Sequence, residues 1–329
     1  DDNKTVGGKN PFFSLNSEEF NDCAFITFTN GSLITEKVVK KLQKLGNVHP
    51  MFSLWGLKED NDAVRGEGCF DMVMQKMDML REAGVFFGAS ITATSKSCDE
   101  VTSDEFMKML SDKGCLWSWF FHYVPVGDSP DVSLVPNAKQ RQQILKAVYN
   151  ARNTLPMMTV DFWGDGPEMM GCIAGGRQYV HVNPNGDVEP CTFVHLATHN
   201  VKNCTLTEAL AAPFMKAIRD GIPYEDGNML RPCMIVDRPD VLRKYYQEFK
   251  PYETHENAAA YLTDPKITSE IDKYSEEVKE ILDEDWRNNL WMTIFPLEGE
   301  YYVDRDNFCS KEKPVNNHKC SGHCAGCGK

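Results

Sequence analysis

The stretch CAFITFTNG, from Cys23 to Gly31, decides the fold class, because an apolar, β-rich run ends there on a polar turn. Four later runs repeat this pattern: Met51–Leu54, Val85–Thr92, Cys115–Tyr123 and Met157–Phe162. β-branched and aromatic residues are typical of the pleated surface of a sheet. We therefore predict a strand at each run, with the strands spaced along the chain like repeated βα units.

Helical patterns fill the intervals between the predicted strands. In Thr35–Leu45 the apolar residues recur near one face, and Phe70–Ala83 repeats this with Met and Leu before Gly84 ends it. Ser103–Leu110 opens with a favourable helix start, and Asn137–Arg152 is a fourth helical stretch. Alternating strands and helices predict an α/β fold with a parallel sheet under helical cover, either a barrel or an open sheet.

In folds of this kind, ligands bind at the carboxyl ends of the strands. Polar and glycine-containing segments stand at those ends, and we expect the functional side chains of the first half there. The segments are Thr29-Asn30-Gly31, Ser53-Leu54-Trp55-Gly56, Thr92-Ala93-Thr94, Tyr123-Val124-Pro125-Val126-Gly127 and Trp163-Gly164-Asp165-Gly166.

The pattern changes near residue 170, where a β-hairpin is predicted. Gln178–Asn183 alternates like a half-buried strand, the Pro-Asn-Gly-Asp turn follows, and Val188–Phe193 returns. We interpret His181 and His195, in or beside this hairpin, as ordinary strand residues rather than ligands.

Helices are predicted to follow the hairpin. We expect one helix over Thr205–Arg219 and a surface helix with few apolar positions over Ser269–Leu290. These patterns divide the chain into a partial barrel over residues 1–168, a small hairpin-plus-helix domain over 169–250, and a helical extension with a cysteine-rich tail over 251–329.

Composition places the chain among ordinary globular proteins. It has 329 residues, 42% of them hydrophobic, and a formal net charge of −13. Negative charge disfavours attraction to nucleic acid or an anionic membrane. No apolar run approaches the roughly 20 residues that span a bilayer, and no signal-peptide core follows Asp1. We expect neither nucleic acid nor membrane as a partner.

Twelve cysteines without a secretory signal favour metal or redox chemistry over a disulfide framework. Cys320, Cys324 and Cys327 form a Cys-x3-Cys-x2-Cys loop whose thiolates suit an iron–sulfur cluster. Zinc is the rival, with His318 or His323 as its fourth ligand. A tail with unligated thiols is the third interpretation.

A second group of cysteines surrounds the hairpin. Cys172 precedes it, Cys191 lies on its second strand, and Cys233 follows in Arg-Pro-Cys. These three are either metal ligands or buried small hydrophobic residues. The remaining cysteines are Cys23, Cys69 and Cys115, expected in the core, and Cys98, Cys204 and Cys309, each a candidate for a missing ligand.

Together these residues resemble the radical S-adenosylmethionine (SAM) enzymes that carry a C-terminal SPASM/Twitch-type domain, over roughly residues 6 to 250. Each matching segment alone is weak, but they occur in the family's order. The segments are Thr29-Asn30-Gly31, Ser53-Leu54-Trp55-Gly56 with Asn61-Asp62 and Arg65-Gly66, Tyr123–Gly127, Gly171–Arg177, Asn185–Cys191 and Arg231-Pro232-Cys233.

The resemblance implies a partial (β/α)6 barrel, complete or incomplete in its strands, with a [4Fe-4S] cluster that binds SAM. Reductive cleavage of SAM would then give a 5′-deoxyadenosyl radical that abstracts a hydrogen from the substrate. By the same resemblance, Gly7 and Gly8 approach the methionyl amino group, Asn30 and Ser53 line the barrel mouth, and Arg65 pairs with the SAM carboxylate.

The resemblance also implies an auxiliary iron–sulfur cluster near Cys172, Cys191 and Cys233. It implies a peptide or protein substrate, a reductant protein such as flavodoxin or ferredoxin, and a cytoplasmic location, because thiolate clusters favour reducing surroundings.

The chain departs from the family pattern in three places. The family's cysteine loop follows its first strand, whereas here that spacing occurs at Cys320–Cys327. Lys9 replaces the acidic residue of Gly-Gly-Glu, and Trp55 replaces the Glu of Ser-Leu-Glu-Gly. Three explanations stay open: a permuted chain, a degenerate non-catalytic iron–sulfur or zinc-binding relative, and a truncated or misassembled product.

Overall fold

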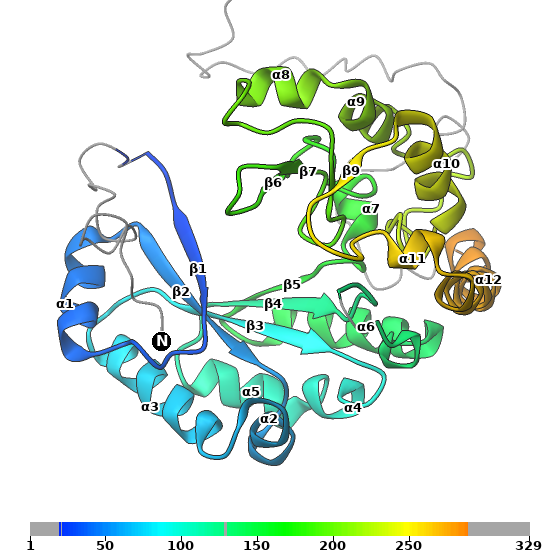
Figure 1. Cartoon of the computed structure of the whole chain (residues 1–329). Helices are drawn as coiled ribbons and strands as arrows, with labels where there is room; N and C mark the ends of the chain where they lie inside the picture. Colours follow the sequence, from blue (N-terminus) through cyan, green and yellow to red (C-terminus); the bar gives the residue numbers. More distant parts are fainter. Residues whose placement is uncertain (1–19, 21, 128–129, 289–329) are drawn as a thin grey trace, which may run out of the picture.

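The computed structural model describes residues 20, 22–127 and 130–288 (Figure 1). Its first half contains a parallel five-stranded sheet in the order β1-β2-β3-β4-β5, which confirms the predicted α/β class. The strands are β1 (Phe25–Thr29), β2 (Val48–Leu54), β3 (Gly88–Ala93), β4 (Trp117–His122) and β5 (Met158–Asp161). A sheet wound in sequence order, with a crossover between neighbours, is the winding of a (β/α) barrel rather than of a doubly wound sheet.

Helices of the first half lie against one side of this sheet (Figure 1). The first begins at the N-cap Thr35, whose side chain accepts the Val38 N–H, and ends at Gly46, where φ is 75°. These elements are α1 (Glu36–Leu45), α2 (Lys58–Arg65), α3 (Cys69–Glu82), α4 (Cys98–Val101), α5 (Asp104–Asp112), the 3-10 helix η3 (Val132–Leu134) and α6 (Ala138–Thr154).

The two faces of the sheet differ in chemistry. Phe52, Ile91 and Phe120 are fully buried in the core shared with the helices. Side chains one position along the strands point to the other face, because strand residues alternate. That second face carries Ser53, paired in register with Ser90, which in turn pairs with Trp119. It is therefore the face that a barrel would turn toward its interior.

The second half builds its own core around short strands and helices. A hairpin forms as predicted, with His181 opposite Glu189 and a turn at Gly186, where φ is 92°. The elements are α7 (Gly166–Met169), β6 (His181–Val182), β7 (Val188–Glu189), β8 (Leu196–Ala197), α8 (Leu206–Ala211), α9 (Pro213–Asp220), α10 (Pro239–Phe249), β9 (Tyr252–Glu253), α11 (Ala260–Thr263) and α12 (Pro265–Arg287).

Three expectations from the sequence are wrong. The helix expected over Thr205–Arg219 is two helices, because Pro213 starts a new one at α9. The expected surface helix, α12, buries residues such as Ile271 and Val278. Cys23 is exposed rather than in the core, since it precedes the edge strand β1.

Of the other two cysteines expected in the core, Cys115 is buried, whereas Cys69 is only half-buried. Within the described ranges, none of the helices combines the length and the apolar character that a membrane crossing requires.

Candidate functional site

A cavity of about 400 Å³ lies between strands β4 and β5 and the loops of the second half. Its walls are mostly apolar, with Trp119 and Phe162 on the sheet side and Tyr179 and Phe193 on the hairpin side. The rings of Trp119 and Phe162 are 6.2 Å apart, and those of Phe162 and Phe193 are also 6.2 Å apart. An apolar cleft with a few polar groups is the usual form of a ligand site.

Three cysteines from three separate loops line this cavity: Cys172, Cys191 and Cys233. Cys172 follows α7, Cys191 follows β7, and Cys233 precedes α10. Backbone N–H groups point at each sulfur, and such contacts also stabilise cluster-bound thiolates. The donors are Ala174 for Cys172, Phe193 and Val194 for Cys191, and Ile235 and Val236 for Cys233.

Burial raises the pKa of all three thiols. For Cys191 it raises the pKa to about 12, with a smaller contribution from Cys172. For Cys233 the pKa is raised by burial and then by Asp237. A metal centre would deprotonate such thiols outright, because its charge replaces the proton.

The chemistry of this donor set suits a thiophilic centre, either iron–sulfur or zinc. Among the described residues, no group of three His, Cys, Asp or Glu side chains is already arranged as a metal site. The three thiols therefore share a cavity without forming a finished coordination sphere.

Acidic groups form a second feature of the cavity wall. Burial, followed by the charge of Asp161, raises the pKa of Asp165 to about 7, although Arg152 opposes this. Burial alone would raise the pKa of Asp161, but His122, with Nε2 2.7 Å from Oδ1, outweighs it and lowers that pKa. A carboxyl group that titrates near neutrality can hold or release a proton beside a substrate.

Two of the predicted SAM residues that the structure describes, Asn30 and Ser53, lie at the ends of β1 and β2. Ser53 faces the side of the sheet opposite the helices, and Asn30 follows β1, where its Oδ1 accepts the Ser32 N–H. Asn30 thus shapes the turn at the strand end as well as lying at the expected edge.

Arg65, the last residue of α2, is half-buried. Its buried Nε has no hydrogen-bond partner among the described residues, and burial lowers the pKa of the guanidinium. A buried guanidinium N–H without a partner suits an incoming carboxylate. The resemblance gives Arg65 that role, which stays a prediction.

The other predicted residues do not join this group. Gly7, Gly8, Cys320, Cys324 and Cys327 lie outside the described residues, so their roles stay predictions. Neither Cys98, which is buried in α4, nor Cys204 lines the cysteine cavity. His181 bonds to Glu189 through Nδ1 at 2.5 Å, and His195 lies just before β8.

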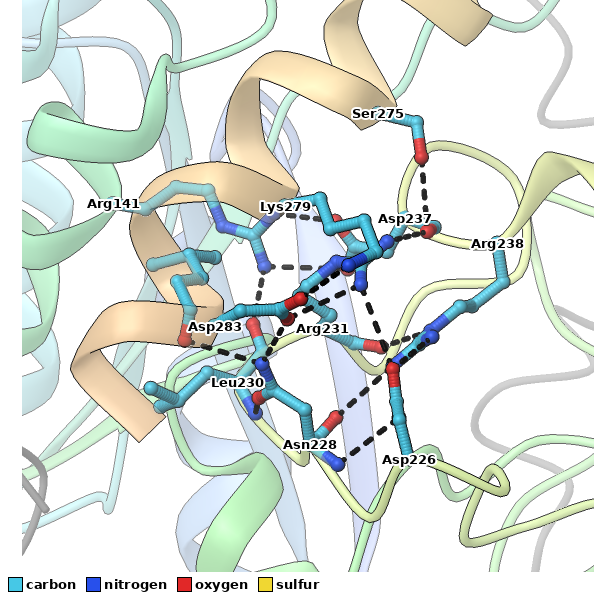
Figure 2. Close-up of polar contacts among 11 residues, drawn as sticks. Arg141, Asp226, Asn228, Leu230, Arg231, Asp237, Arg238, Ser275, Lys279 and Asp283 are labelled. Carbon is cyan, nitrogen blue, oxygen red and sulfur yellow. Dashed lines mark hydrogen bonds and ion pairs between the residues drawn. The ribbon is translucent and has the colours of Figure 1, made fainter. Parts of the chain in front are cut away.

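Sequence reasoning missed the polar network around the Cys233 loop, which Figure 2 shows. Its centre is the ion pair between Arg141 of α6 and Asp237. Both residues are buried, with 5% and 0% of their surfaces exposed. Nothing in the sequence near either residue marks the pair, because 96 positions separate them.

Comparisons with known proteins identify relatives of the chain. None of the protein-family models matches it. Mycofactocin maturase MftC of Mycolicibacterium smegmatis is 32% identical over 176 residues, which are 50% of this chain and 44% of that protein. AdoMet-dependent heme synthase of Nitratidesulfovibrio vulgaris is 25% identical over 206 residues, 54% of this chain and 55% of that protein. The chain spans about half the length of these curated relatives.

Solved structures agree at the level of the fold. Native anSMEcpe with bound AdoMet and Cp18Cys peptide aligns with a TM-score of 0.51 and 16% identity, over 79% of this chain and 76% of that chain. The relatives by sequence and the neighbours by fold are radical SAM proteins. The chain is therefore related to the radical SAM proteins and has the parallel α/β architecture of their partial barrel, which confirms the resemblance found in its sequence.

Proposed function

We propose that the chain is part of a radical SAM iron–sulfur enzyme that cleaves SAM reductively and abstracts a hydrogen atom from a peptide or protein. The observation that carries this proposal is the convergence of Cys172, Cys191 and Cys233 on one cavity beside the open face of a barrel-like sheet. The relationship to radical SAM proteins supports it.

In this proposal, the chain's own residues bind SAM and orient it. Arg65 offers the unpaired Nε of its guanidinium to the methionyl carboxylate, and Ser53 and Asn30 lie at the ends of the neighbouring strands β2 and β1. Gly7 and Gly8, with the cluster ligands Cys320, Cys324 and Cys327, complete this site in the proposal by resemblance alone. When bound, the cluster and SAM together supply the radical chemistry.

On the substrate side, the proposed role of the cavity is to exclude water and hold an apolar part of the substrate. Its walls of Trp119, Phe162 and Phe193 suit that role, because a closed apolar site keeps a reactive intermediate from side reactions. A peptide substrate is supported by the name of the maturase relative and by the peptide in the anSMEcpe structure. A flavodoxin or ferredoxin as reductant and a cytoplasmic location belong to the same proposal.

The test is production of 5′-deoxyadenosine by anaerobically reconstituted protein with SAM and dithionite. We expect Arg65→Leu to weaken SAM binding by roughly 10- to 100-fold, because a charge-assisted hydrogen bond is worth about 1.5–3 kcal/mol. Arg81→Leu, on a half-exposed Arg of α3 that bonds the Asp112 carbonyl, is the matched control and should bind SAM normally.

Either of two outcomes would contradict the proposal. Equal SAM affinity in the Arg65 and Arg81 variants would remove Arg65 from the site. Metal binding without any 5′-deoxyadenosine would favour the alternative function, a degenerate non-catalytic iron–sulfur or zinc-binding protein.

A further inference from the structure

The turn that carries Cys233 is fixed by hydrogen bonds to Asp237 and its neighbour. The Asp237 carboxylate accepts the Cys233 N–H at 3.0 Å. In return, the backbone N–H groups of Asp237 and Arg238 donate to the Cys233 carbonyl, at 2.9 and 3.1 Å. The direction in which the Cys233 backbone presents its thiol thus depends on where the Asp237 carboxylate lies.

That carboxylate is held from the first half of the chain (Figure 2). Arg141 of α6 donates to both of its oxygens, from Nη1 to Oδ1 at 2.5 Å and from Nη2 to Oδ2 at 3.2 Å. Nη2 also donates to the Leu230 carbonyl at 2.8 Å. The guanidinium stacks 4.6 Å from the ring of Trp163, which lines the cavity.

The remaining groups around Asp237 hold its backbone. Arg231 donates to the Asp237 carbonyl at 2.8 Å, and Ser275 of α12 donates to the same oxygen at 3.1 Å. Arg238 is occupied elsewhere, by a two-point ion pair with Asp226. Arg141 is therefore the cation that pairs directly with the carboxylate of Asp237, and Arg231 also feels the charge of that carboxylate.

The charge of Asp237 reaches the cavity. After burial, it is the next largest cause of the raised pKa of Cys233. It also raises the pKa of Cys172, where the charge of Arg177 opposes it. Charges in a buried place are poorly screened, so a centre bound to these sulfurs would respond to the same carboxylate. Nearby charge and hydrogen bonds to sulfur are among the factors that set the reduction potential of an iron–sulfur cluster.

We propose that Arg141 and Asp237 are a positioning pair that presents Cys233 and sets the reduction potential of an auxiliary iron–sulfur cluster bound by Cys172, Cys191 and Cys233. This inference rests on the proposed function, since it needs that cluster. It assigns to α6, a helix of the barrel, control over a centre in the second half of the chain.

The test compares Asp237→Asn with Arg141→Gln in the full chain, with Cys320, Cys324 and Cys327 changed to Ala so that the auxiliary centre is observed alone. Each protein is reconstituted anaerobically and titrated with a chemical reductant, with electron paramagnetic resonance as the readout. Arg243→Gln, which breaks the less buried Arg243–Asp272 pair on α10 and α12, is the matched control.

We expect opposite shifts. Removing the anion in Asp237→Asn should raise the ratio of reduced to oxidised cluster at the parent midpoint potential by roughly tenfold, because a buried unit charge acts strongly over a short distance. Removing the cation in Arg141→Gln should lower that ratio by a similar factor. The double variant should return toward the parent, Arg141→Lys should keep most of the parent behaviour, and Arg243→Gln should match the parent.

The outcomes separate the inference from the proposed function. A role in folding alone would lower iron content in both variants, with shifts of the same sign or none, and would overturn the inference. Loss of iron in both variants, restored in Arg141→Lys, would support the positioning role. Arg141→Lys keeps the positive charge, so a midpoint potential in this variant that differs from the parent's would overturn the electrostatic role. Absence of any cluster that depends on Cys172, Cys191 and Cys233 would overturn the auxiliary site in the proposed function as well.

Discussion

At the scale of single residues, hydrogen-bond partners distinguish an arginine with a structural role from an arginine that is a candidate for ligand binding. Arg141 is buried, and Asp237 and the Leu230 carbonyl satisfy it. Arg65 is half-buried, and its Nε has no partner among the described residues. An unsatisfied buried donor costs about 1–3 kcal/mol, so an anion from outside the chain would remove that cost. In the sequence, Arg141 is one polar residue of a predicted helix, and Arg65 stands out only through the resemblance.

Candidate ligand cysteines differ from core cysteines in their location and not in the pKa of their thiols. Burial raises the pKa of both Cys115 and Cys191 to about 12. Cys115 lies in the core under the sheet, whereas Cys191 shares the cavity with Cys172 and Cys233. A raised thiol pKa therefore marks burial, and only the shared cavity marks the candidate site.

The raised pKa of Cys191 predicts slow alkylation of the metal-free protein. At pH 8 we expect Cys191 to react with iodoacetamide at least about tenfold more slowly than the exposed Cys23, because the thiolate is the nucleophile. The rate should rise about tenfold per pH unit between pH 8 and 10, below the pKa. Peptide mass spectrometry measures both rates, with Cys115 as a buried control. Labelling of Cys191 as fast as Cys23 would show that its thiol is open to solvent.

At the scale of elements, the sequence predicts the strands and most helices because each shows its own periodicity. The starts of the strands are less exact. β2 begins at Val48 rather than at the predicted Met51, and it accommodates Pro50 because that residue pairs with β1 only. β3 begins at Gly88 rather than at the predicted Val85. The short α2 was missed for another reason: its sequence KEDNDAVR is almost wholly polar, so no apolar stripe marks it.

The long helix α12 shows how an apolar stripe can be sparse and still be buried. Its buried residues recur at helical spacing along one side, and most of its other residues are charged. Tyr274 donates to the Pro136 carbonyl at 2.7 Å, which joins the helix to the segment before α6. We therefore regard α12 as part of the core rather than a surface helix.

A substitution in this stripe tests that view. Ile271 is fully buried, so Ile271→Ala should lower the free energy of unfolding by about 2–5 kcal/mol, through lost burial and the cavity left behind. Glu276→Ala, on the exposed side of the same helix, should change it by less than about 0.5 kcal/mol. Urea unfolding followed by circular dichroism measures both changes. Similar effects of the two substitutions would show that α12 is a surface helix.

At the scale of the whole molecule, the candidate site exists only because distant segments meet. The hairpin makes the approach of Cys172 and Cys191 foreseeable from sequence, but the return of Cys233 depends on how α8 and α9 turn the chain back. The Arg141–Asp237 pair depends in turn on the packing of the second half against α6. Local periodicity carries no information about either contact, so the sequence names the three cysteines without showing that they share a cavity.

Metal content tests the whole arrangement at once. After anaerobic reconstitution, we expect the Cys172→Ala/Cys191→Ala/Cys233→Ala variant to lose roughly four irons per chain, one full cubane cluster. The Cys320→Ala/Cys324→Ala/Cys327→Ala variant should lose a similar amount if the terminal loop is the second site, and Cys98→Ala should lose none. Because the two triple variants remove different clusters, their losses should add. Zinc in the parent protein, or unchanged iron in both triple variants, would instead show that the thiols of this chain serve a structural metal or the core.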